Sequence, residues 1–157
     1  MLNTTEMNWS LRHILYSAAL LLAVNVVSAS DTLQLDSVGE IHTFVADQKG
    51  HLFVADQHFT LYKLDAQGKE ISRVNTKVYG AIYSIDCSNP FELYVFHKDQ
   101  NLVVFYDNML NVRGELRLND LGLTNVGAVA RSFDNGIWVL DLNAIEIKKL
   151  DKEGNIK

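Results

Sequence analysis

The feature that most constrains this chain is a sequence unit that occurs three times in succession. Each copy holds a run of four apolar residues, a polar break, a second apolar stretch and an aspartate at a turn. The central valines of the three runs, Val54, Val95 and Val139, are 41 and 44 residues apart. The runs themselves cover 52–55, 93–96 and 137–140. A regular period of this size indicates an array of similar supersecondary units.

The turn aspartates give the same period independently, because Asp65, Asp107 and Asp151 are 42 and 44 residues apart. Helical arrays and four-stranded propeller blades share this period, so the type of secondary structure must decide between them. The units are rich in Val, Ile, Leu, Phe and Tyr, and turn sequences such as "DQKG", "DAQG" and "DNG" recur between the apolar stretches. This composition favours strands.

The uninterrupted apolar runs predict strands that are covered on both faces. A strand with one face in water alternates apolar and polar residues, whereas a strand buried on both faces is apolar throughout. Propeller blades pack face to face around an axis and bury their inner strands in this way. The sequence therefore predicts an all-β fold, a β-propeller-type array of about three four-stranded antiparallel blades that is incomplete as a ring.

The blades are expected at about 41–77, 78–120 and 121–157, after a leader at 1–29 and a linker or closing strand at 30–40. Tyr94 and Trp138 lie inside apolar runs, so both are expected to pack in the core. The expected strands are 41–46, 51–56, 60–65, 70–74, 81–86, 92–97, 102–107, 112–117, 126–132, 136–141 and 145–151, with a stub at 155–157.

The first unit, "VADQKGHLFVADQHFTLYKLDAQGKEI", resembles the NHL-type repeat of six-bladed propellers. That pattern has an aspartate, a glycine turn, a strand ending in Ala-Asp and a second strand ending in Asp-x-x-Gly-Lys. The second unit departs from it, with His97 at the position of Asp56. The chain is also similar to exported bacterial propeller proteins with "NPF", "LYVFHKD" and "VVFYDN" segments. The matching positions are Asp47, Gly50, Val54, Ala55, Asp56, Leu64, Asp65, Gly68 and Lys69, then Asp134, Gly136, Val139, Asp141, Leu150, Asp151 and Gly154.

Three units do not close a propeller, since rings use 4 to 8 blades. A truncated piece of a longer protein is the first explanation, and a homodimer that completes a six-bladed ring is the second. An open arc is the third, and it would expose an apolar face on each terminal blade.

The amino end carries an export signal. Arg12 and His13 precede an apolar run of 14 residues at 14–27, and "SAS" follows it. This pattern is typical of a secretory signal peptide that is cleaved before Ser30. The run is shorter than the roughly 20 residues of a membrane span, so an uncleaved anchor is the weaker alternative and no stable span is expected after cleavage. The chain is expected to be exported, to the periplasm, the cell envelope or the outside.

Charge and cysteine content exclude several classes of protein. A net charge of −5 argues against binding to nucleic acid, which requires a basic surface. The single cysteine, Cys87, cannot form an intramolecular disulfide and is expected to be a small buried apolar residue. The core must therefore hold the fold together.

Polar residues near the strand ends give the candidate site. Asp56, His58, His97 and Asp141 are the expected ligand-binding residues, and no catalytic residue or metal ligand set is assigned. Their spacing, with that of His42, His51 and Asp47, matches no compact metal motif. Calcium or zinc held between blades is kept as an alternative, although an aspartate after a strand more often bonds nearby backbone amides.

Two functions remain open. The preferred one is a non-catalytic module of the cell envelope that binds a protein, peptide or glycan through one rim of loops. The alternative is a metal-dependent six-bladed hydrolase or lyase, similar to lactonases, of which this chain is a truncated part. The lack of clustered polar ligands favours binding over catalysis.

Overall fold

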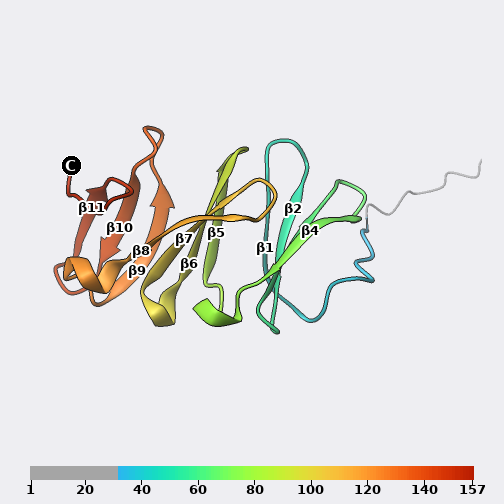
Figure 1. Cartoon of the computed structure of the whole chain (residues 1–157), viewed down its shortest axis with the longest axis horizontal. Coiled ribbons are helices and arrows are strands. Elements are labelled where there is room, and N and C mark those ends of the chain that lie inside the picture. The colour runs from blue at the N-terminus through green and yellow to red at the C-terminus, as the bar shows by residue number, and fades with distance from the viewer. Residues whose placement is uncertain (1–31) are drawn as a thin grey trace, which may run out of the picture. The chain divides into compact units, whose positions relative to one another are not determined.

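The computed structural model describes residues 32–157, of which Leu33–Lys157 form one compact unit. This part of the chain is built from three antiparallel β-sheets that follow one another in sequence order (Figure 1). The expected leader at 1–29 lies outside the described residues. The predicted all-β fold, an incomplete propeller-type array, is confirmed for the described part.

The first sheet contains β1 (Ile41–Ala46), β2 (Leu52–Asp56), β3 (Thr60–Leu64) and β4 (Glu70–Asn75). The second contains β5 (Ser84–Asn89), β6 (Glu92–His97), β7 (Leu102–Asp107) and β8 (Val112–Arg117). The third contains β9 (Val126–Arg131), β10 (Ile137–Asp141) and β11 (Glu146–Leu150). Short 3-10 helices η1 (Lys77–Tyr79), η2 (Lys98–Gln100) and η3 (Leu118–Leu121) lie in the connections.

The strand positions expected from the sequence agree with the structure to within a residue, except at β5. That strand was expected over 81–86 and occupies Ser84–Asn89. Ile82, inside the expected range, is buried in the core between the first two sheets but precedes the residues of β5 that pair with β6. The expected stub at 155–157 is a single bridge between Leu150 and Ile156, so the third sheet has three strands.

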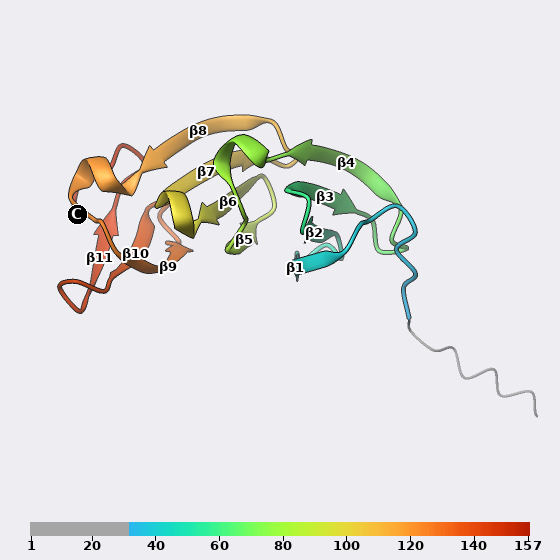
Figure 2. The same cartoon turned by 90° about the horizontal axis from the view of Figure 1, so that it is seen from below.

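The sheets pack face to face, with β1, β5 and β9 on the concave side of the array and β4 and β8 on the convex side (Figure 2). We call the side of a sheet that points to the following sheet its forward face, and the opposite side its rear face. Phe53, Ala55 and Leu61 on the forward face of the first sheet share one core with Leu93 and Val95 of the second. A second core joins Tyr94, Phe96 and Val103 to Ile137 and Val139 in the same way.

The middle strands of the first two sheets are dry on both faces, as the apolar runs predict. Phe53, Val54 and Ala55 are each at most 2% exposed, and so are the four residues of the run at 93–96. In the third sheet the run alternates, because Val139 is buried whereas Trp138 is 41% exposed. The expectation that Trp138 packs in the core is therefore wrong. Its side of the sheet is the forward face, which no further sheet of the described residues covers.

The segment before β1, expected as a linker or a closing strand, contains no strand in its described residues. Leu35 and Val38 in this segment pack on the rear face of the first sheet, against Val54, Tyr62 and Leu64. We call residues 33–40 the strap. The strap gives the first sheet a partial rear cover.

The turn aspartates form the turns predicted for them. Asp65 Oδ1 accepts hydrogen bonds from the backbone N–H groups of Gln67 (3.0 Å) and Lys69 (2.9 Å). Asp107 bonds the amides of Met109 and Asn111 in the same manner, at 2.9 Å each. Since such bonds satisfy the open amides of a tight turn, the carboxylates fix the register of each hairpin.

Lysines join neighbouring sheets at the edges of the two cores. The Lys63 ammonium lies 5.7 Å from the centre of the Phe53 ring and donates to the Asn108 carbonyl of the second sheet at 2.8 Å. Lys152 forms an ion pair with Glu92 at 2.6 Å across the other junction. Both contacts satisfy a charge while its aliphatic stem covers apolar surface.

The core between the sheets predicts a clear difference between two truncations. Leu61→Ala removes a side chain with no exposed surface, so we expect the free energy of unfolding to fall by about 2–5 kcal/mol. Val78→Ala, at a residue 81% exposed, is the control and should change it by less than about 0.5 kcal/mol. Urea unfolding of the variants measures both, and equal effects would contradict the described core.

Candidate ligand-binding rim

One end of the sheets gathers all the connections between sheets. Because the strands are antiparallel, the ends of β2, β4, β6 and β8 lie beside the starts of β1, β3, β5 and β7. We call the loops at this end the crossover rim and those at the opposite end the hairpin rim. The crossover rim consists of residues 57–59, 76–83, 98–101, 118–125 and 142–145.

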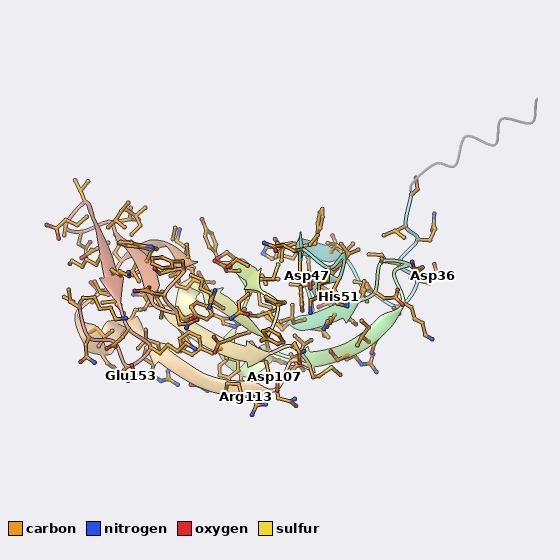
Figure 3. All side chains as sticks on the ribbon, turned by 90° about the horizontal axis from the view of Figure 1, so that it is seen from above. Asp36, Asp47, His51, Asp107, Arg113 and Glu153 are labelled. Carbon is orange, nitrogen blue, oxygen red and sulfur yellow. The ribbon has the colours of Figure 1, made fainter. Side chains whose placement is uncertain are left out.

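The hairpin rim is built from turns that bond to themselves. Asp47 accepts from the ring Nδ1 and the backbone N–H of His51, at 2.8 Å and 2.9 Å (Figure 3). Asp107 pairs with Arg113 at 2.7 Å on the same rim. These contacts already satisfy the polar groups, so the hairpin rim offers few of them to a ligand.

The four residues that the sequence nominates all lie at the crossover rim, but in separate loops. Asp56 ends β2 and His58 lies in the loop that follows it, His97 ends β6, and Asp141 ends β10. Each sheet thus contributes one or two of them, and they do not converge on one point.

Asp56 holds its own turn together. Its Oδ1 accepts from the backbone N–H groups of His58 (2.9 Å) and Thr60 (2.8 Å), and its Oδ2 accepts from the Tyr62 hydroxyl at 3.2 Å. The side chain is 7% exposed. A buried carboxylate with three donors is mainly a structural group, although Asp56 also lines a hollow of the rim.

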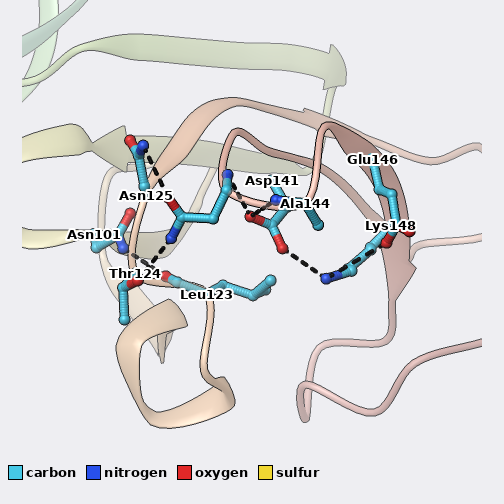
Figure 4. Close-up of polar contacts among 9 residues, drawn as sticks. Asn101, Leu123, Thr124, Asn125, Asp141, Ala144, Glu146 and Lys148 are labelled. Carbon is cyan, nitrogen blue, oxygen red and sulfur yellow. Dashed lines mark hydrogen bonds and ion pairs between the residues drawn. The ribbon is translucent and has the colours of Figure 1, made fainter.

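Asp141 repeats this role in the third sheet (Figure 4). Its Oδ1 accepts from the backbone N–H groups of Asn143 (3.0 Å) and Ala144 (3.3 Å), and its Oδ2 accepts from Lys148 at 2.6 Å. The hydrogen bond from Lys148 holds the pKa of the Asp141 carboxyl below its ordinary value. Asp141 is therefore neutralised locally.

His97, at the equivalent position of the second sheet, is completely buried. Its Nδ1 lies 3.1 Å from the Gly80 carbonyl, and the Tyr79 ring lies 5.5 Å from its own ring centre. Its Nε2 is buried and has no hydrogen-bond partner among the described residues. Burial lowers the pKa of His97, so the neutral ring is the stable form near neutral pH.

Two adjoining hollows at the crossover rim lie between the first two sheets and share His42, Ala81 and Ile82. Their volumes are about 290 Å³ and about 200 Å³. We call them together the crossover cleft. Asp56 and Phe59 border the cleft on one side, so a residue nominated from the sequence does reach it.

Tyr83 and Lys98 border the cleft on the side of the second sheet. Tyr83 is 50% exposed, and the Lys98 ammonium lies 4.5 Å from the centre of its ring. The pair presents an aromatic surface with a hydroxyl beside a positive charge, a combination common in binding sites. Lys98 is not among the residues that the sequence nominates, and His42 is considered there only as a metal ligand, since nothing in the spacing shows that 42, 81–83 and 98 meet.

A third cavity of about 390 Å³ lies along the inner strands β1, β5 and β9, towards the hairpin rim. Asp86 in it accepts from the backbone N–H of Arg131 at 2.8 Å and so connects the second sheet to the third. Cys87 in the same cavity is 6% exposed, and burial raises the pKa of its thiol. A protonated thiol is a weak nucleophile, which agrees with the expected packing role of Cys87.

Within residues 32–157, no three side chains of His, Cys, Asp or Glu gather closely enough to hold a metal ion. The same described part contains no helix long and apolar enough to cross a membrane.

No protein-family model matches this chain, and no curated protein matches it. Solved structures do. The structure of a streptogramin B lyase has a TM-score of 0.61 at 15% identity, over 77% of this chain and 41% of that one. The structure of a luciferin-regenerating enzyme has a TM-score of 0.53 at 15% identity, over 74% of this chain and 44% of that one. The structure of a Bacteroides fragilis protein described as exported has a TM-score of 0.50 at 15% identity, over 81% of this chain and 38% of that one.

These similarities establish the fold. At 15% identity the likeness shows a propeller-type architecture and no activity, and the chain spans less than half the length of each of these proteins.

The buried His97 predicts a specific pH dependence. An unfolded histidine binds a proton near its ordinary pKa of 6.5, while the folded ring has a lower pKa. The folded state therefore binds fewer protons below that value, so the free energy of unfolding should fall as the pH drops from about 7 towards 5. His97→Phe keeps a ring and removes the titration, and urea unfolding of this variant should show a flatter pH profile. An identical slope in both proteins would contradict the buried neutral ring.

Proposed function

We propose that this chain is a non-catalytic, exported propeller module of the cell envelope that binds a protein, peptide or glycan at its crossover cleft. The observation that carries the proposal is the cleft itself, where Tyr83 and Lys98 face a hollow that also reaches His42 and Asp56. Binding pockets combine apolar lining with a few polar groups that orient the ligand. The cleft has this composition, with Ala81 and Ile82 as its apolar lining.

The scaffold suits such a role. The sheets below the rim are fixed by two dry cores and by turns whose aspartates are fully bonded. Loops on a rigid scaffold hold a binding surface in place while their sequence varies freely. The apolar run at 14–27 and the similarity to a Bacteroides fragilis protein described as exported support export.

We further propose that the three units are NHL-type repeats of a six-bladed propeller. The aspartates and glycines of that repeat pattern support this assignment, because they occupy the turns that the pattern requires. Gly50 and Gly68 have φ angles of 82° and 80°, in the left-handed region that favours glycine. Each glycine closes a turn that begins at an aspartate three residues earlier. The backbone N–H of Gly50 donates to the Asp47 carbonyl, and that of Gly68 donates to the Asp65 carbonyl.

The alternative function is a metal-dependent lyase or hydrolase. The streptogramin B lyase and the luciferin-regenerating enzyme among the similar structures favour it. In this chain the carboxylates of Asp56 and Asp141 are already bonded to their own turns. A metal site would need ligands from further blades, so binding is the better supported role.

The proposal predicts which residues a ligand contacts. A glycan array and a random peptide library are screened with the purified chain, and the tightest hit is titrated by calorimetry. Lys98→Ala and Tyr83→Ala should each weaken its binding by about tenfold or more, the effect of losing a central contact. The matched controls are Lys49→Ala and Phe91→Ala, which alter a similar cation and ring pair, 5.4 Å apart, on the hairpin rim.

Two results would overturn the binding proposal. One is a hit whose affinity changes only in the Lys49 and Phe91 variants, which would place the ligand on the other rim. The other is stoichiometric calcium or zinc in the purified protein, measured by elemental mass spectrometry, that is lost on Asp56→Ala or Asp141→Ala. That second result would favour the enzyme.

A further inference from the structure

The forward face of the third sheet consists of positions that are buried in the other two sheets. With the repeat steps of 41 to 44 residues, Phe53 and Tyr94 correspond to Trp138, and Leu61 and Val103 correspond to Ile147. Phe53 and Tyr94 are each 2% exposed, and Leu61 and Val103 have no exposed surface. Trp138 is 41% exposed and Ile147 is 69% exposed. The same face is thus covered twice and left open once.

The lysine contact is repeated as well. Lys149 corresponds to Lys63, two repeats earlier. Lys63 lies over Phe53 and donates to a turn carbonyl of the following sheet. Lys149 lies over Trp138, 5.2 Å from its ring centre, and within residues 32–157 it forms an ion pair with the exposed Asp134 next to its own sheet. The third sheet therefore carries the same group of apolar residues and lysine with which the first sheet contacts the second, whereas the second sheet has Phe105 at the lysine position.

The opposite end of the described unit is the rear face of the first sheet, where Val54, Tyr62 and Leu64 are buried under the strap. Phe44 pairs with Val54 across β1 and β2, so both lie on the rear face of the first sheet. Phe44 is 67% exposed, and the strap covers Val54 but not Phe44. In both junctions of this structure, a forward face packs on a rear face.

We propose that two copies of this chain associate head to tail, the forward face of each third sheet packing on the strap and rear face of the partner's first sheet, to close a ring of six sheets.

The way in which the sheets of this chain pack on one another indicates which surface covers the forward face of the third sheet. A forward face with an aromatic residue and a branched apolar residue fits the rear face of a sheet of the same repeat, as it does at both junctions inside the chain, and the lysine is shared with the first of these junctions. Among the described residues, the rear faces of the second and third sheets are covered by the preceding sheets, and the rear face of the first sheet is covered by no other sheet. A six-sheet ring lies within the 4 to 8 blades that propellers use. Closure buries an apolar patch that a monomer would expose.

Sedimentation velocity of the chain expressed without residues 1–29, over about 1–100 μM, tests this proposal. We expect a dimer, and we expect Ile147→Glu and Phe44→Glu each to raise the dissociation constant at least tenfold, because each places a charge in both junctions. Val78→Glu is the matched control, since Val78 is 81% exposed in η1 and lies on neither face. Circular dichroism confirms that each variant is folded.

Mixing the two weakened variants distinguishes the ring from other dimers. One copy of Ile147→Glu and one of Phe44→Glu can form a dimer with one intact junction, so the mixture should associate more strongly than either variant alone. A monomeric wild-type chain at the highest concentration would overturn the proposal. So would a dimer that Phe44→Glu leaves intact, which would mean that the third sheets contact each other. Absence of rescue in the mixture would also contradict the ring.

Discussion

The packing of one sheet on the next is the interaction on which the rest of this structure depends. It removes both faces of β6 and the forward face of β2 from water, while the strap covers the rear face of β2. A fully buried apolar side chain contributes roughly 1.5–3 kcal/mol. The chain has one cysteine and no disulfide, so these contacts must supply most of its stability. Lys63 and Lys152 seal the edges of the two cores, and the aspartates fix the turns that connect the strands.

The same packing explains where a ligand can bind. The polar side chains at the strand ends are not free to bind a ligand. Asp56 and Asp141 accept hydrogen bonds from the backbone amides of their own turns, and His97 is buried. The side chains that remain available to a ligand are those of Tyr83, Lys98 and His42, which line the crossover cleft. The stacked sheets therefore determine the fold, and the crossover rim carries the side chains that are accessible to a ligand. The proposed binding role rests on that division, while the similar solved structures support the architecture alone.

Much of the fold could be predicted from the sequence because its determinants are local. The strand over 92–97 follows from the run "LYVF", and the turn at Asp65 follows from Asp-x-x-Gly. Trp138 could not be placed correctly, because its exposure depends on whether another sheet follows, which no local pattern records. The cleft was missed for a similar reason. His42 and Lys98 are 56 positions apart, and only the packing of the first sheet on the second brings them to one hollow.

Native-state hydrogen exchange tests the central claim most directly, since it reports how much free energy is needed to expose each amide. β6 is the middle strand with a sheet on either side, so its amides at 93–96 should exchange only through global unfolding and be the slowest in the chain. The amides of β10, whose sheet has no other sheet of the described residues on its forward face, should exchange faster. Exchange of β6 at the rate of β10 or above would contradict the account of sheets stacked face to face.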